Sequence, residues 1–339
     1  MPCAAIHCSS ARRPSAPGSA GSYRPAACHS ASCCCSAAWS SACCSSADGR
    51  SSTPPTVAAR GLRSRRMSTV LITGCSSGFG ELAALTFHRR GHRVFATMRR
   101  PGSSAALDAV PGIEQLPLDV CDDASVKAAV AEVIERAGGI DIVVNNAGIE
   151  VFGAVHLASD EEVLRQFDTN VLGVVRVARA VVPHMIERGG GAIVNVGSVA
   201  GLVGAPYGGI YAASKHAVEA LTEAMHFELS QQGIRVSVVE PGQFATQLGA
   251  KGFVAEAMAP GTPEHDRWQR FRTAQRSLVN GEPADPQRVA DVIYAAATER
   301  PGKLRWPVGG DADLIIATKS AMSFEDFDTT MRAALNWHE

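Results

Sequence analysis

A tyrosine and a lysine four residues apart, Tyr211 and Lys215, have the types and spacing needed for acid–base chemistry. On a helix this spacing places both side chains on one face, so both can reach the same bound ligand. A phenol with a free-solution pKa of about 10 is a poor base at neutral pH unless a nearby positive charge stabilises its phenolate. Lys215 can supply that charge, so the pair suits general acid–base catalysis with Tyr211 as the proton carrier.

A glycine-rich turn far upstream indicates which kind of ligand Tyr211 and Lys215 would act on. Thr73-Gly74-Cys75-Ser76-Ser77-Gly78-Phe79-Gly80 follows a β-rich run and precedes a helical pattern. Glycines at a strand-to-helix turn let the backbone approach a pyrophosphate at the helix N-terminus. An ordinary tight turn would also contain glycines, but the position after the first strand of an alternating chain favours dinucleotide binding.

These residues must be positioned by an α/β fold. From Met67 onward, short β-rich runs alternate with longer segments of helical period, which predicts a parallel sheet covered by helices on both faces. The expected strands are Thr69–Thr73, Arg93–Thr97, Ile113–Leu118, Ile140–Val144, Ala192–Val196, Ile234–Val239 and Leu304–Val308. The expected helices are Phe79–Arg90, Asp123–Ala137, Glu161–Arg188, Tyr211–Gln231, Pro286–Thr298 and one around Phe324–Leu335. Only residues 243–285 break the alternation, so we expect a single domain, 67–339, with one long insertion after the sixth strand.

In order and spacing these features resemble the short-chain dehydrogenase/reductase family, over about Ser68 to Gly310. Asn145-Asn146-Ala147-Gly148 follows the fourth strand, and Ser198 follows the fifth. Pro241-Gly242 closes the sixth strand. The glycine loop and the Thr97-Met98-Arg99 end of strand two look most similar to the hydroxysteroid and retinol dehydrogenase branch. The resemblance implies a Rossmann-type, doubly wound, mainly parallel seven-stranded sheet, and a homodimer or homotetramer.

The same resemblance implies residue roles in hydride transfer between an alcohol or ketone and NAD(P). Tyr211 would transfer the proton, Ser198 would polarise the substrate oxygen, Lys215 would also bind the nicotinamide ribose, and Asn170 would hold a water linking Lys215 to solvent. The implied cofactor-binding residues are Gly74, Ser76, Ser77, Gly78, Phe79, Gly80, Arg99, Asp119, Val120, Asn146, Ala147, Gly148, Tyr211, Lys215, Pro241, Gly242 and Thr246. Asp119 would bond adenine, although helix capping is an alternative role for it beside Asp122 and Asp123.

The end of the second strand bears on cofactor preference. An acidic residue there would hold the ribose 2′-hydroxyl, but Met98 stands at that position and Arg99 follows. A guanidinium can pair with a 2′-phosphate, so the sequence predicts a preference for NADP(H). Use of NAD(H) stays open if Arg99 and Arg100 both face solvent.

The insertion is expected to select the substrate. Its first half supplies apolar side chains, and its charged second half, Glu264 to Arg276, predicts a solvated helix with Trp268 and Phe271 turned inward. Ligands of open α/β sheets bind beyond the carboxyl ends of the strands, where this insertion begins. We therefore expect a lipophilic secondary alcohol or ketone, with a small polar alcohol or sugar as the alternative if these side chains only pack the loop.

Two other functions fit parts of the pattern. A sugar-nucleotide epimerase or dehydratase also uses Tyr and Lys at this spacing, but such enzymes usually show T-G-x-x-G-x-x-G and a longer C-terminal part. A non-catalytic dinucleotide-binding regulator would be marked by loss of a catalytic side chain. All four are present in this sequence: Asn170, Ser198, Tyr211 and Lys215.

The first 66 residues differ from the rest. They hold eight of the ten cysteines, eight Arg and one acidic residue, with no apolar run able to pack. We interpret them as a disordered leader, either preceding the true start at Met67 or acting as an organelle-targeting segment. The remainder carries a net charge of −8 and has no basic patch for nucleic acid. It has no apolar stretch long enough to span a membrane and no metal-ligand spacing. These features predict a cytoplasmic protein.

Overall fold

The computed structural model describes residues 67–244, 252–278, 284–300 and 302–336, all within the unit Leu62–Glu339. The expected leader, residues 1–66, lies outside the described residues. So does Thr246.

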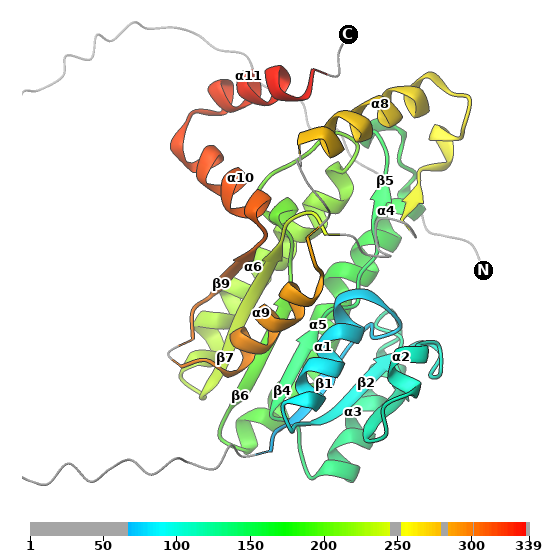
Figure 1. The fold of residues 1–339 in the computed structure, drawn as a ribbon. Coiled ribbons are helices and arrows are strands. Elements are labelled where there is room, and N and C mark those ends of the chain that lie inside the picture. Colours follow the sequence, from blue (N-terminus) through cyan, green and yellow to red (C-terminus); the bar gives the residue numbers. More distant parts are fainter. Residues whose placement is uncertain (1–66, 245–251, 279–283, 301, 337–339) are drawn as a thin grey trace, which may run out of the picture. The chain divides into compact units, whose positions relative to one another are not determined.

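The central element is a seven-stranded sheet in which every neighbouring pair is parallel (Figure 1). The inner strands are largely apolar and are buried on both faces, as in a parallel sheet covered by helices. The order is β3-β2-β1-β4-β6-β7-β9, which confirms the predicted Rossmann-type architecture. The bounds are β1 (Thr69–Ile72), β2 (Arg93–Met98), β3 (Ile113–Pro117), β4 (Ile142–Asn145), β6 (Gly191–Val196), β7 (Ile234–Pro241) and β9 (Arg305–Val308).

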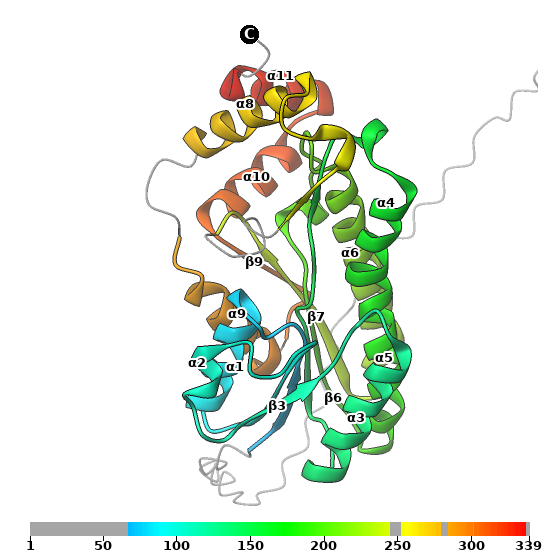
Figure 2. The same ribbon diagram turned by 90° about the vertical axis from the view of Figure 1, so that its right-hand side faces the viewer.

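Helices cover both faces of the sheet (Figure 2). Side chains of successive strand residues pack alternately toward one helical layer and the other. In β1, Val70 and Ile72 belong to the core under one helical layer, while Leu71 belongs to the core under the other. The first layer contains α1 (Gly78–Arg89), α2 (Ala105–Asp108) and α9 (Gln287–Thr298). The second contains α3 (Asp123–Ala137), α5 (Gly173–Glu187) and α6 (Gly209–Ser230).

The long helix expected over Glu161–Arg188 was wrong as a continuous α-helix. The chain forms α4 (Asp160–Phe167), then a π-helical segment, η2 (Asp168–Leu172), and then α5. The π-helical segment has only 5 residues, too few for the apolar periodicity to separate it from the helices on either side. The segment places Asn170, one of the predicted site residues, in the irregular turn.

The insertion after β7 is organised around a second, two-stranded sheet. Strand β5 (Val151–Phe152) pairs in parallel with β8 (Phe253–Val254). After β8 the chain forms η4 (Glu256–Met258) and α8 (Pro263–Leu278), whose Trp268 and Phe271 are buried, as predicted. Helix α10 (Gly310–Ala321), which was not predicted, and α11 (Phe324–Leu335) end the fold, and α11 contacts α8 (Figure 1). The short turns η1 (Val155–Leu157) and η3 (Val199–Gly201) complete the described elements.

Candidate active site

The predicted glycine loop lies at the carboxyl end of β1, and the segment after β4 is bonded to it. The amide of Asn146 donates to the carbonyl oxygens of Thr73 and Gly74 at 2.9 and 3.0 Å, and the main-chain N–H groups of Asn146 and Ala147 donate to Thr73 Oγ1 at 3.1 Å. Gly74 has a φ of 72°, and a Cβ there would lie 2.7 Å from Ala147 Cα. Glycine is therefore required at this contact. The structure thus brings the glycine loop and Asn146–Gly148 together at the N-terminus of α1, a place able to hold a pyrophosphate.

The residues predicted to bind the adenosine end of the cofactor follow β2 and β3. Met98 is buried at the end of β2, and Arg99 is exposed directly after it. Within the described residues, the Arg99 guanidinium makes no hydrogen bond or ion pair, so it is available to a ligand. After β3, Asp119 Oδ1 accepts the N–H of Cys121 at 3.0 Å, whereas Asp122 caps α3. The capping role that was open for Asp119 therefore belongs to Asp122.

Val120 lies beside these residues and is buried against the helix that follows the π-helical segment. A Cβ at Gly173, the first residue of α5, would lie 2.9 Å from Val120 Cβ. The close approach of α5 to this position depends on that glycine.

Tyr211, Lys215 and Ser198 are brought together where β6 and β7 end. Tyr211 and Lys215 lie on α6, both nearly fully buried, with the Lys215 Nζ 5.7 Å from the centre of the tyrosine ring. Lys215 Nζ also donates to the carbonyl oxygen of Val196 at 2.8 Å. Ser198 is the N-cap of the η3 turn, and its Oγ donates to the carbonyl oxygen of Pro241 at 3.4 Å. Its side chain is also close enough to the Tyr211 hydroxyl to lower the pKa of that group.

Burial controls the protonation of this pair. Removal from water raises the pKa of Tyr211 above its ordinary value, the charge of Glu150 raises it further, and the hydrogen bond with Ser198 opposes the shift. Burial lowers the pKa of Lys215 to about 8, against the effects of Glu150 and Glu219. Without a ligand, Tyr211 is therefore a protonated acid at neutral pH.

Asn170 binds the main chain of Ile149, which directly follows the Asn146–Gly148 segment. Its Oδ1 accepts the N–H of Ile149 at 2.9 Å, and its Nδ2 donates to the Ile149 carbonyl oxygen at 3.0 Å and to Ser214 Oγ at 3.2 Å. Because Ser214 precedes Lys215 on α6, the π-helical turn connects the catalytic helix to the segment after β4.

Glu150 is a site residue that the sequence reasoning missed. It follows Ile149, is half-buried, and acts electrostatically on both Tyr211 and Lys215. Burial raises its own pKa to about 7, while the charges of Lys215 and Arg272 oppose the rise. The available signal was a single acidic residue between apolar neighbours directly after the Asn-Ala-Gly segment.

Helix α8 and strand β5 form an aromatic wall next to Glu150. The rings of Phe152 and Trp268 have centroids 5.7 Å apart, and the Arg272 guanidinium lies 5.3 and 5.0 Å from their centres. The rings of Phe271 and Tyr207 also pack together, with centroids 5.8 Å apart. The wall is therefore largely apolar, with one cation stacked on it.

The segment after β7 is held by both β9 and α10. Gly242 N–H donates to the Val308 carbonyl oxygen at 2.9 Å, and the N–H of Gln243 donates to Asp311 at 2.5 Å. Phe244 contacts Phe79 of the glycine loop edge to face, at 5.8 Å. The beginning of the insertion therefore lies against the cofactor loop.

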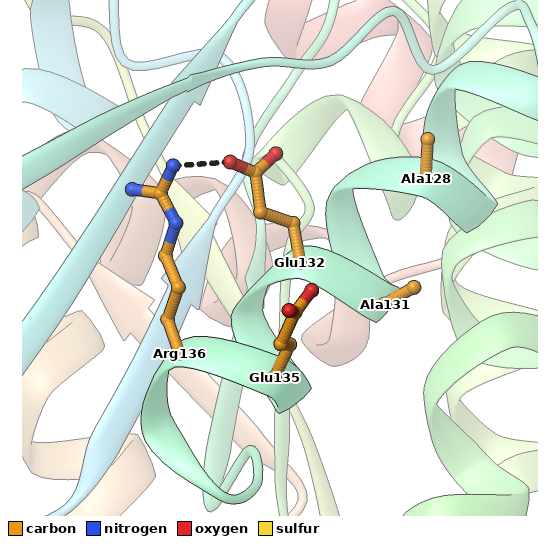
Figure 3. A pocket seen from close by; sticks show the side chains of 5 residues that line it. All are labelled: Ala128, Ala131, Glu132, Glu135 and Arg136. Atoms are coloured by element: carbon orange, nitrogen blue, oxygen red, sulfur yellow. Dashed lines mark hydrogen bonds and ion pairs between the residues drawn. The ribbon is translucent and has the colours of Figure 1, made fainter.

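A surface hollow on α3 lies away from these groups. Figure 3 shows its lining side chains, which all come from one helix: Ala128, Ala131, Glu132, Glu135 and Arg136. Glu132 and Arg136 form an ion pair one turn apart, as helix surfaces commonly do. We therefore assign the site to the carboxyl ends of the strands rather than to this hollow.

The described part of the chain contains neither a membrane-spanning helix nor a metal-binding cluster. None of its helices combines the length and apolar character that crossing a membrane requires. Nor do the described residues contain a cluster of His, Cys, Asp or Glu side chains arranged to hold a metal ion.

Comparison with solved structures supports the architecture. A short-chain dehydrogenase from Streptomyces avermitilis is 32% identical, with a TM-score of 0.66 over 80% of this chain and 96% of its own. A 3-ketoacyl-(acyl-carrier-protein) reductase from Brucella melitensis, complexed with NADH, is 26% identical, with a TM-score of 0.63 over 72% and 98%. ElxO with NADP bound is 27% identical, with a TM-score of 0.60 over 73% and 99%.

Sequence comparison agrees. A 3-ketodihydrosphingosine reductase from Bacteroides thetaiotaomicron is 34% identical over 73% of this chain and 90% of its own length. Retinol dehydrogenase 8 from Bos taurus is 40% identical over 66% and 76%, and a 17-beta-hydroxysteroid dehydrogenase type 6 from Rattus norvegicus is 33% identical over 72% and 81%. The predicted likeness to the hydroxysteroid and retinol dehydrogenase branch is confirmed. The model of the short chain dehydrogenase family matches residues 68–256, and the chain belongs to that family of oxidoreductases.

Proposed function

We propose that the protein interconverts a lipophilic secondary alcohol and its ketone, or an alcohol and its aldehyde, with NADP(H) as the preferred cofactor. The observation that carries the proposal is the assembly of Tyr211, Lys215 and Ser198 at the same sheet edge as the glycine loop. Ligands of doubly wound sheets bind at that edge.

The chain's own residues account for the proton. Buried Tyr211 remains protonated and can donate to the carbonyl oxygen during reduction, while Ser198 holds the same oxygen. The ammonium of Lys215 stabilises the phenolate that results. A nicotinamide cofactor, when bound, supplies or accepts the hydride.

The cofactor assignment is supported by the loop and by the neighbours. The glycine loop and the Asn146 segment fit a pyrophosphate because a Cβ at Gly74 would meet Ala147, and solved neighbours hold NADH or NADP. Arg99 favours the 2′-phosphate because it is exposed, lies directly after β2 and is unpaired among the described residues.

The lipophilic substrate is supported by the aromatic wall of Phe152, Trp268 and Phe271. The relatives named for 3-ketodihydrosphingosine and for retinol act on molecules with long hydrocarbon parts, which is consistent with such a wall.

The test is NADPH consumption by the full chain across a panel of steroid ketones, retinoids, long-chain ketones, bulky aryl ketones, sugars and small polyols. Turnover of the lipophilic compounds is expected to be far more efficient. Efficient turnover of sugars alone would overturn the substrate assignment. NADPH binding without turnover of any compound would favour a dinucleotide-binding regulator, and isomerisation of a sugar nucleotide without net NADPH use would favour an epimerase.

A further inference from the structure

Two carboxyl groups that the proposed mechanism does not use lie behind the catalytic lysine. Glu219 is one turn after Lys215 on α6, and Glu240 is on β7 just before Pro241. They are only 5% and 1% exposed. Arg305 of β9 reaches both, with its Nε 3.3 Å from Glu219 Oε2 and 3.5 Å from Glu240 Oε1.

Glu219 also packs against the turn that carries the catalytic serine. A Cβ at Gly197 would lie 3.0 Å from Glu219 Oε1, and a Cβ at Gly201 would lie 3.0 Å from Glu219 Cγ. These glycines are on either side of Ser198. The Glu219 carboxyl group therefore contacts the turn holding Ser198 and lies on the helix that holds Lys215.

The charges around the two groups do not balance if both are ionised. Arg305 also pairs with Glu223, at 3.2 Å, so one guanidinium faces three carboxyl groups. Both Glu219 oxygens and Glu240 Oε1 are buried, and beyond the ion-pair contacts with Arg305 they have no hydrogen-bond partner among the described residues. A proton held between two carboxyl groups removes one negative charge and gives these oxygens a partner.

The direction of protonation is consistent with this arrangement. Burial raises the pKa of both carboxyl groups, and the charge of Glu219 raises that of Glu240 further, to about 7. Because Glu240 is the more buried of the two and Glu219 lies closer to Arg305, we assign the proton to Glu240 and the negative charge to Glu219. Ionised Glu219 in turn raises the pKa of Lys215.

Other charged groups on the surrounding elements have other partners or face solvent. Lys319 of α10 donates to the carbonyl oxygen of Leu202, after η3. On α9, which packs on β7, Arg288 and Asp291 are exposed. The charges that face the pair are thus Lys215, Glu223 and Arg305.

We propose that Glu219 and Glu240 share one proton and act as a positioning pair for Lys215. Glu240 supplies the proton, Glu219 keeps its negative charge next to the lysine, and Arg305 balances that charge. The pair sets the protonation of Lys215 and connects α6, β7 and the serine turn. This inference rests on the proposed carbonyl reduction at the same site.

The test compares three isosteric variants of the full chain: Glu219→Gln, Glu240→Gln and, as a matched control, Glu223→Gln, which removes the half-exposed partner of the same Arg305. The readout is the pH dependence of kcat/KM for ketone reduction, whose alkaline limb reports the coupled titration of Tyr211 and Lys215. Unfolding temperature and NADPH binding are measured for each variant.

We expect the two buried variants to affect that limb differently. Glu219→Gln removes the charge beside the lysine, so the limb should move down by about one pH unit. Glu240→Gln leaves Glu219 ionised with its full charge, so the limb should stay or move up. Glu223→Gln should leave it unchanged. Shifts in the same direction for the two buried variants, or no shift in Glu219→Gln with normal NADPH binding, would overturn the proposal.

A second measurement does not depend on turnover or on a variant's activity. The infrared difference between wild type and Glu240→Gln at neutral pH should contain the carbonyl band of a protonated carboxyl group. If Glu240→Gln does not fold, titration of that band in Glu150→Gln, which lacks the other carboxyl group with a pKa of about 7, decides the question. Absence of the band would overturn the shared proton, whereas its presence in a protein that reduces no ketone would overturn the proposed function and leave the shared proton standing.

Discussion

The ammonium group of Lys215 donates a 2.8 Å hydrogen bond to the carbonyl oxygen of Val196, the last residue of β6. The bond connects helix α6 to the strand that ends two residues before Ser198. An ammonium has three donors, so two remain for a ligand or for water. Lys215 can therefore hold the sheet edge and bind a cofactor hydroxyl at the same time.

Replacing Tyr211 with Phe should lower kcat by at least about a hundredfold, because it removes the general acid while leaving the ring in its buried place. NADPH binding, measured by fluorescence titration, should remain close to wild type. Lys215→Ala is the contrasting variant and should impair both turnover and NADPH binding. Near-normal turnover in Tyr211→Phe would remove the basis of the mechanism.

Arg99→Ala should weaken NADPH binding by about tenfold or more, because a charge-assisted hydrogen bond to the 2′-phosphate is lost. Binding of NADH, which lacks that phosphate, should not change. Arg100→Ala is the matched control, since Arg100 is equally exposed. Equal effects on both cofactors would show that Arg99 does not read the phosphate.

Glu150→Gln should change the pH dependence of stability. The pKa of Glu150 is raised to about 7 in the folded protein, so the wild type loses stability as pH rises from about 4.5, the ordinary value, toward 7. Gln does not titrate, so the variant should gain unfolding temperature relative to wild type above pH 7 but not at pH 4. A constant difference across this range would contradict the assignment.

The same variant should shift catalysis. Because the charge of Glu150 raises the pKa values of Tyr211 and Lys215, Glu150→Gln should move the alkaline limb of ketone reduction to lower pH. Activity measured across the pH range with a single ketone checks the direction. No shift would mean that Glu150 is protonated throughout the working range, and an upward shift would contradict the electrostatic role of Glu150.

Trp268→Ala should raise the KM for bulky lipophilic ketones by about tenfold, because it removes the largest side chain of the aromatic wall. The kcat at saturation should change less, since Trp268 is not among the groups around Tyr211. Phe324→Ala, which removes a 72% exposed ring on α11, serves as the control. Equal losses in both variants would indicate a general effect on stability.

A chain that begins at Met67 should be soluble and should bind NADPH as the full chain does. Strand β1 starts at Thr69, and its pairing with β2 and β4 begins there or one residue later. Gel filtration and NADPH titration of both chains provide the comparison. Aggregation of the shorter chain alone would assign the first 66 residues a role in folding.

The sequence predicted all seven strands of the main sheet because each is a short run between helical segments, and β1, β4, β6 and β7 are also rich in Val and Ile, a signal contained within the strand itself. Asn170, Ser198, Tyr211 and Lys215 could be identified together because they occur in one order along the chain. The π-helical turn at Asn170 was missed because it depends on hydrogen bonds to Ile149 and Ser214, residues distant in sequence.

Charged groups showed the same limit. Glu150, Glu219 and Glu240 look like ordinary acidic residues in the sequence, and only their burial beside Lys215 and Arg305 gives them a role. Helix α10 was missed because its apolar residues do not gather on one side, so its periodicity is weak.

The pairing of β5 with β8 has a consequence for how this molecule can be redesigned. The two strands are joined through main-chain groups: the N–H groups of Phe253 and Ala255 donate to the carbonyl oxygens of Glu150 and Phe152. Main-chain bonds of this kind accept many different side chains. Residues of β8 and α8 can therefore be exchanged to fit another substrate while the attachment to the Glu150 segment is kept, which makes this wall a natural target for changing specificity.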